Sequence, residues 1–194
     1  QIITIGRRFG SGGRGIGKCL AEKLGIPFYD KELITAAAKQ SGLCDSFLQN
    51  FEETPTSRLM YSLVMNAQNG GLVAYEAQIN AVREAAKNGP CVIVGRCADY
   101  ILKDDYDVVS VFITASPEYR AARAAKLENI SIKEAQAKLN RMDKARASYH
   151  NYHAETKWGA SDSYELCINS EKLTTEQAAD LIKFYIDNRK APEE

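Results

Sequence analysis

Short apolar runs alternate along this chain with longer stretches in which apolar positions recur every three or four residues. The runs are rich in β-branched residues and predict buried strands; they lie at residues 2–5, 26–29, 90–94, 108–113 and 164–168. The stretches between them predict amphipathic helices, the first over residues 16–24 and the last over about 174–188. Strands that alternate with helices predict an α/β fold of three layers, in which helices cover both faces of a five-stranded parallel sheet.

The length and continuity of the chain predict a single domain over residues 1–194, because no internal repeat or low-complexity linker divides it. Residues 44–88 are predicted to be largely helical, and we interpret them as a cap inserted between the second and third strands. Residues from about 120 to 160 hold predicted helices with several arginines, and we interpret them as a lid region.

The overall charge is balanced, with 25 Lys and Arg against 25 Asp and Glu. This balance gives no signal for a nucleic-acid polymer or a membrane surface as partner. The five cysteines are odd in number and lack C-x-x-C spacing, which favours reduced thiols in a cytoplasmic protein. No signal peptide or long apolar run is present, so we expect neither secretion nor a membrane span. The sequence leaves the oligomeric state open.

A glycine-rich motif follows the first predicted strand and opens the first predicted helix. Residues 12–19 read GGRGIGKC, which fits the phosphate-binding pattern Gly-x4-Gly-Lys. Backbone N–H groups, the helix N-terminus and the Lys18 ammonium would together attract a nucleotide triphosphate. A glycine-rich turn without a ligand is the simpler alternative, although so many glycines are costly in backbone entropy. The residues expected to contact the nucleotide here are Gly10, Ser11, Gly12, Gly13, Arg14, Gly15, Ile16, Gly17, Lys18 and Cys19.

Cys19 departs from the pattern, since Ser or Thr is expected at its position. The usual hydroxyl binds Mg²⁺, whereas a neutral thiol is a poor ligand for a hard cation. We therefore expect Mg²⁺ to be carried by the nucleotide and water, or to be bound weakly, and we assign no side chain to the metal with certainty.

Charged residues gather where the predicted strands end, which is the edge of an open α/β sheet that binds ligands. Asp30, Arg96 and Asp99 follow the second and third strands, and we expect them to bind the acceptor. Arg120 and Arg123 lie near the start of the helix after the fourth strand. They could contact the nucleotide or lie on the solvated surface, and both alternatives stay open. Asp30 could also serve only as a helix N-cap. A further set lies in the lid region and suits neutralisation of a phosphoryl group in transfer: Arg141, Asp143, Lys144 and Arg146.

His150 and His153 are spaced three residues apart, but no carboxylate or cysteine near them in sequence favours a metal site. The aromatic residues around them suit either packing of the lid or stacking on a base, and neither is favoured; they are Tyr149, Tyr152 and Trp158.

Taken in order, these segments resemble a cytidylate kinase, and more narrowly the cytidylate kinase-like branch of the P-loop nucleoside monophosphate kinases. The matching segments cover nearly the whole chain and are residues 10–18, 28–32, 92–96 with 98–100, 143–146, 157–159 and 166–170. The resemblance implies ATP and Mg²⁺, with CMP or dCMP as the acceptor and the diphosphate as product. It implies that Lys18 contacts the β- and γ-phosphates, that Arg96 with Arg83 binds the acceptor phosphate, and that Asp143 positions Arg146. Asp30 would line the acceptor pocket, and Arg146 would act from the lid.

The departures from that family fall mainly on recognition of the base. Cys97 stands where cytidylate kinases carry an aspartate after Gly-Arg, and Val94 replaces a further aspartate. The lid region also has fewer arginines than in that family. Phosphoryl transfer is therefore better supported than cytidine specificity. Two alternatives stay open: a kinase for another small acceptor, such as a sugar or a shikimate-like alcohol, and a nucleotide-binding protein without turnover.

Overall fold

The protein is described by a computed structural model, in which residues 1–30 and 69–189 are placed. Their five strands form one sheet of order β2-β3-β1-β4-β5, in which every neighbouring pair is parallel. The bounds are β1 Ile2–Arg7, β2 Phe28–Tyr29, β3 Cys91–Val94, β4 Val108–Thr114 and β5 Leu166–Asn169. The predicted fold class, an α/β fold with a five-stranded parallel sheet, is confirmed. The second strand is shorter than predicted, because Pro27 has no N–H to donate to a neighbouring strand.

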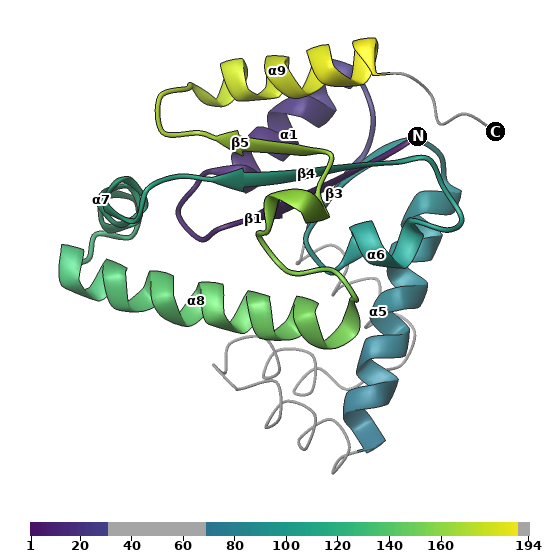
Figure 1. The fold of residues 1–194 in the computed structure, drawn as a ribbon, viewed down its shortest axis with the longest axis horizontal. Coiled ribbons are helices and arrows are strands. Elements are labelled where there is room, and N and C mark those ends of the chain that lie inside the picture. Colours follow the sequence, from purple (N-terminus) through teal and green to yellow (C-terminus); the bar gives the residue numbers. More distant parts are fainter. Residues whose placement is uncertain (31–68, 190–194) are drawn as a thin grey trace.

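Helices cover both faces of the sheet, as Figure 1 shows. On one face lie α1 (Gly13–Leu24) and α9 (Thr175–Asn188), and on the other α5 (Asn69–Lys87), α6 (Ala98–Leu102) and α8 (Ile132–His153). Helix α7 (Pro117–Glu128) lies beyond the end of β4, and a short 3-10 helix, η1 (Ser161–Ser163), precedes β5. Alternate residues of β1 divide between the two cores: Ile3 and Ile5 pack with α1 and α9, while Ile2 packs with α5 and α6.

The signals for helix ends predicted from the sequence are present as capping contacts. Ser116 accepts a hydrogen bond from the Tyr119 amide and Pro117 occupies the first helical position of α7, while Ser131 and Thr174 form capping boxes at α8 and α9. The predicted cap over residues 44–88 is placed only in part, as α5; its remainder, and the helix expected after Asp30, lie outside the described residues. None of the helices in the placed ranges combines the length and apolarity that a membrane crossing requires.

Candidate active site

The glycine-rich motif leaves the central strand β1 and turns directly into α1. Gly10 and Gly12 adopt φ angles of +81° and +85°, in the left-handed region that glycine tolerates best. Two hydroxyls tie the turn to the sheet: Ser11 Oγ donates to the Arg8 carbonyl at 2.8 Å, and Ser170 Oγ donates to the Ser11 carbonyl at 2.7 Å. The loop is therefore shaped by the protein itself, and the start of α1 offers a favourable end for anionic groups.

The residues of the motif divide between ligand-facing and structural positions. Lys18 has a side chain that is 64% exposed and lies 3.8 Å from Glu22, so its ammonium can reach a bound phosphate. The Ile16 amide donates to the Gly12 carbonyl at 3.1 Å, and the Ile16 side chain is buried in the core. Gly17 is packed so closely that a Cβ would lie 3.0 Å from both Ile5 and Val94.

Cys19 is half-buried and packs against the hydrophobic core beside α1. A thiol in this position does not fit Mg²⁺, which prefers hard oxygen ligands. Nowhere in residues 1–30 and 69–189 do three or more His, Cys, Asp or Glu side chains gather as a candidate metal site.

Arg123 and Arg120 differ in their surroundings although both start from α7. The guanidinium of Arg123 lies beside the loop, 3.6 Å from where a Cβ on Gly12 would stand. Arg120 is buried instead: Nε donates to the Ala115 carbonyl at 3.1 Å and Nη1 to the Phe9 carbonyl at 3.0 Å. The structure thus rules out a solvated surface position for Arg120 and directs its donors to protein groups. Contact with the nucleotide is better suited to Arg123, and for both arginines it stays a prediction.

Asp143 links the lid region to the entrance of the loop. Its carboxylate accepts hydrogen bonds from the Phe9 amide at 2.7 Å and from Arg120 Nη1 at 2.7 Å, and Arg8 lies 3.6 Å away. We call Asp143, Arg120 and the Phe9 backbone the Phe9 clamp. One turn further along α8, Arg146 Nη1 donates to the Arg7 carbonyl at 3.2 Å. The sequence predicts that Asp143 positions Arg146; the structure shows Asp143 holding the loop and Arg146 bound to the same strand end. Arg141, on the same helix, is exposed.

Three arginines line a single cavity at the end of β1 and β3, and we call it the arginine cavity. They are Arg7, Arg96 and Arg146. Arg96 is buried and its Nη1 donates to Gln78 Oε1 at 3.1 Å, while the Tyr149 hydroxyl donates to the same oxygen at 2.6 Å. Burial lowers the pKa of all three guanidinium groups, and that of Arg7 is lowered further by the charges of Arg146 and Arg96. Such a concentration of positive charge is relieved when an anion binds.

The turn that carries Arg96 has an unusual backbone. Gly95, Arg96 and Cys97 are consecutive, and all three have positive φ, at 83°, 62° and 51°. Side chains other than glycine rarely adopt this region, and strain of this kind persists where the surrounding structure fixes it, often at functional sites. Here it directs Arg96 into the cavity at the point where α6 begins.

Asp30 and Asp99 are both buried or nearly so, but the groups that act on their carboxyl charges differ. Asp30 accepts a hydrogen bond from Arg14 Nε at 2.7 Å, and Arg14 Nη2 lies equally close, so the carboxylate is held in an ion pair. Asp99 lines the arginine cavity, and its burial raises the pKa of its carboxyl while the charge of His150 opposes that rise. Arg83 does not join them: its side chain is 51% exposed, faces Asp105 at 3.9 Å, and is not among the residues that line the cavity.

The aromatic residues serve two different purposes. Tyr149 and Tyr152 pack edge-on against His153, whose ring stacks on Tyr75 of α5 at 3.5 Å, which fastens α8 to α5. Trp158 instead lines the arginine cavity, along with Tyr149 and Tyr164, and meets Phe112 edge-on. The cavity therefore combines cations with aromatic faces that could stack on a planar group.

His150 forms part of the cavity wall rather than a metal pair with His153. Its Nδ1 lies 3.6 Å from Cys97 Sγ, and its Nε2 lies 2.9 Å from Thr156 Oγ1. Burial lowers the pKa of His150, an effect that the charge of Asp99 opposes, and burial raises the pKa of the Cys97 thiol.

Several residues of this site were not singled out by the motifs. Arg7 and Arg8 precede the glycine-rich turn, and Gln78 and Ser170 lie far away in sequence. The one signal available for the first two was their place at the end of the strand that carries the loop. Gln78 carries no such signal, because its contacts depend on how the sheet and helices pack, whereas Ser170 ends the segment 166–170 that carries the family resemblance.

Comparison with known proteins agrees with this geometry. The cytidylate kinase-like family matches residues 2–172 of the chain. The chain belongs to the cytidylate kinase-like family. It is a phosphotransferase of the nucleoside monophosphate kinase group. Cytidylate kinase from Pyrococcus horikoshii is 28% identical over 189 residues, covering 96% of this chain and 88% of that protein. Cytidylate kinase from Methanococcus maripaludis is 27% identical over 194 residues, covering 98% and 100%.

Solved structures place this cytidylate kinase-like protein in the same fold. An uncharacterized protein from Eubacterium ventriosum superposes with a TM-score of 0.75 at 34% identity, covering 97% of this chain and 99% of that one. Shikimate kinase from Bacteroides thetaiotaomicron superposes with a TM-score of 0.55 at 16% identity, covering 96% and 98%. The second likeness, at 16% identity, shows the fold alone.

Proposed function

We propose that this protein transfers the γ-phosphoryl group of ATP to a nucleoside monophosphate, with CMP or dCMP as the acceptor. The observation that carries the proposal is the arginine cavity, which opens at the carboxyl ends of β1 and β3 beside the phosphate loop. Its guanidinium groups suit an acceptor that is itself a phosphate, and the cytidylate kinases among the relatives supply the choice of base.

The donor and the acceptor would occupy the two sides of the β1–α1 turn. Lys18 and the loop amides would hold the β- and γ-phosphates, with Arg123 beside them. Arg96, fixed by Gln78, and Arg146 would hold the acceptor phosphate. ATP brings Mg²⁺ with it, and the metal would add neutralising charge on the phosphates; no side chain of the motif is assigned to it.

The reaction needs positioning more than it needs a base. A phosphate oxygen of the acceptor is already nucleophilic, so it can attack the γ-phosphorus in line while the bond to the bridging oxygen of ADP breaks. This point separates the proposal from a kinase for alcohols, which would want a free carboxylate at the acceptor. Asp30 is 4% exposed and paired with Arg14, which does not favour that role.

A coupled assay of ADP release tests the proposal, with ATP and Mg²⁺ and a panel of CMP, dCMP, UMP, AMP and GMP. Turnover with CMP or dCMP alone is expected. Turnover of several monophosphates would support the kinase activity and contradict the specificity for CMP or dCMP. Binding of ATP without turnover on any of them contradicts the proposal and favours another acceptor or a nucleotide-binding protein without catalysis.

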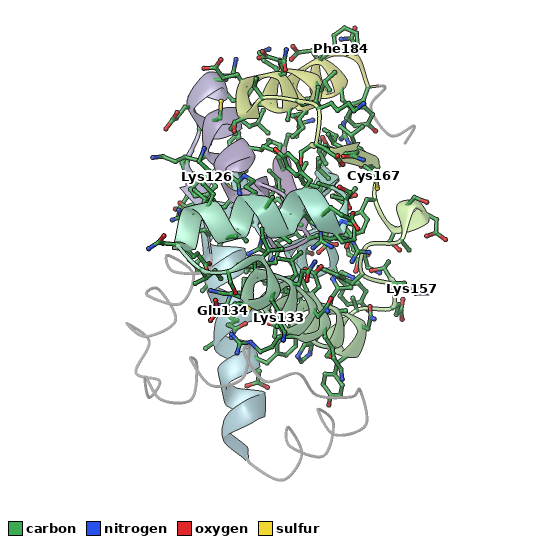
Figure 2. The ribbon with its side chains drawn as sticks, turned by 90° about the vertical axis from the view of Figure 1, so that its left-hand side faces the viewer. Lys126, Lys133, Glu134, Lys157, Cys167 and Phe184 are labelled. Carbon is green, nitrogen blue, oxygen red and sulfur yellow. The ribbon has the colours of Figure 1, made fainter. Side chains whose placement is uncertain are left out.

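Two variants test which residues form the site. Lys18→Ala should lower kcat by orders of magnitude, whereas Arg96→Ala should chiefly raise the KM of the acceptor. Lys126→Ala is the matched control, because Lys126 is exposed on α7 (Figure 2) and takes no part in the site. Wild-type rates in both site variants would show that the site is misplaced.

A further inference from the structure

Arg7 is the last residue of β1 and stands between the two halves of the site. Its backbone pairs with Ile113 in β4, and its carbonyl accepts a hydrogen bond from Arg146 Nη1 at 3.2 Å. Because β1 is the central strand and Arg7 is paired with β4, the sheet itself fixes the backbone of Arg7.

Two glycines make room for this one side chain. A Cβ on Gly13, in the phosphate loop, would lie 2.6 Å from Arg7 Cβ. A Cβ on Gly95, in the turn that carries Arg96, would overlap with Arg7 Nη1. The stem of Arg7 thus passes against the loop that would hold the donor, and its guanidinium reaches the turn that would hold the acceptor.

Within residues 1–30 and 69–189, the positive charges that act on Arg7 outnumber the negative ones. Arg146 and Arg96 both lower the pKa of Arg7, in addition to the effect of burial. The acidic group that opposes them is Asp30, and that carboxylate is already shared with Arg14 at 2.7 Å. Three guanidinium groups in one cavity repel one another until a multiply charged anion lies among them.

We propose that Arg7 is a further catalytic residue, whose guanidinium contacts the phosphoryl group in transfer between the loop and the acceptor. This inference rests on the proposed function. Arg7 would donate hydrogen bonds to non-bridging oxygens of that group while the acceptor oxygen forms its bond to phosphorus and the bridging oxygen leaves with ADP. No proton has to move to or from Arg7, which stays charged throughout.

The first test uses inorganic phosphate and the fluorescence of Trp158, the one tryptophan in the sequence, which lines the arginine cavity. Phosphate should change the wild-type emission with a saturable dependence. In Arg7→Met the apparent affinity should fall at least about tenfold, which corresponds to roughly 1.4 kcal/mol. Lys126→Met, on the outer side of α7, should titrate like the wild type. An emission that phosphate does not change in the wild type, or that changes equally in Arg7→Met, overturns the inference.

The second test separates catalysis from binding and from folding. With the monophosphate that the wild type uses best, Arg7→Met should lower kcat by about a hundredfold while the KM for ATP changes little. Arg7→Lys keeps the charge and most of the stem, so it should fold and bind phosphate within a few-fold of wild type. It should still lose about tenfold in kcat, because an ammonium lacks the planar fork. Wild-type kcat in Arg7→Lys and Arg7→Met, with thermal melts unchanged, contradicts the role.

The two proposals can fail separately. If the wild type turns over no monophosphate, the proposed function fails, and the phosphate titration of Trp158 still decides whether Arg7 builds an anion site. If the wild type is active and phosphate binds equally to Arg7→Met, the function stands and the role of Arg7 is refuted.

Discussion

The Phe9 clamp offers a sharp test of how the lid region is joined to the phosphate loop. Arg120 and Asp143 have side chains that are 7% and 13% exposed, and their charged atoms lie 2.7 Å apart. Replacing Arg120 by methionine keeps the length of the side chain and removes three hydrogen bonds, to Asp143, Phe9 and Ala115. Of the hydrogen bonds and ion pairs described above, Asp143 would then keep the Phe9 amide and the more distant Arg8.

The expected cost follows from these contacts. Removal of one partner from a buried ion pair costs about 3–5 kcal/mol, and Arg8 at 3.6 Å, 36% exposed, offsets part of this. We therefore expect Arg120→Met to lower the free energy of unfolding by about 3 kcal/mol, near the low end of that range. For a chain of this length that corresponds to a fall in Tm of roughly 6–12 °C.

A second variant shows whether the buried charge is the cause. Asp143→Asn keeps an oxygen to accept the Phe9 amide and removes the negative charge, so the double variant Arg120→Met/Asp143→Asn should recover most of the lost stability. Urea unfolding followed by circular dichroism, with differential scanning calorimetry, measures both. A loss below about 1 kcal/mol in Arg120→Met, or a double variant no more stable than the single one, would refute the reasoning.

Three further predictions concern single positions. Gly95→Ala should lose about 1–3 kcal/mol of stability, because Gly95 has a φ of +83°, and it should weaken phosphate binding because the new Cβ displaces Arg7. Gly89→Ala is the control: Gly89 has a φ of +114° and open space around it, so thermal melts and Trp158 titrations should show the backbone cost alone. Burial lowers the pKa of His153 to about 4 from about 6.5, so the unfolded chain takes up the proton first and the free energy of unfolding should fall as pH drops through that window. His153→Gln should flatten this fall in urea titrations at several pH values. An unchanged dependence of the unfolding free energy on pH would contradict the prediction. Cys19→Ser should leave Mg²⁺ dependence of ADP release unchanged or improve it, because a hydroxyl is the harder ligand, and loss of turnover in a folded variant would point to a role for the thiol.

The sequence was informative where structure depends on neighbouring residues. The β-branched runs and the glycine spacing predicted the sheet and the β1–α1 turn, since both arise from local backbone preferences. Arg120 shows the limit: its spacing from Arg123 suggests a shared role, yet one guanidinium is buried against Asp143 and the other lies beside Gly12. Which direction a helical side chain takes depends on what packs against the helix, and Asp143 is 23 residues away in sequence.

The arginine cavity draws two of its aromatic residues from a segment that supplies none of its guanidinium groups. Its guanidinium groups come from β1, the turn after β3, and α8, whereas Trp158 and Tyr164 come from the segment between α8 and β5. Substitutions in that segment therefore change the aromatic face of the cavity without replacing any of its three arginines. Under the proposed function, a library that randomises Trp158 and Tyr164 keeps every arginine of the cavity and samples the preference for the acceptor.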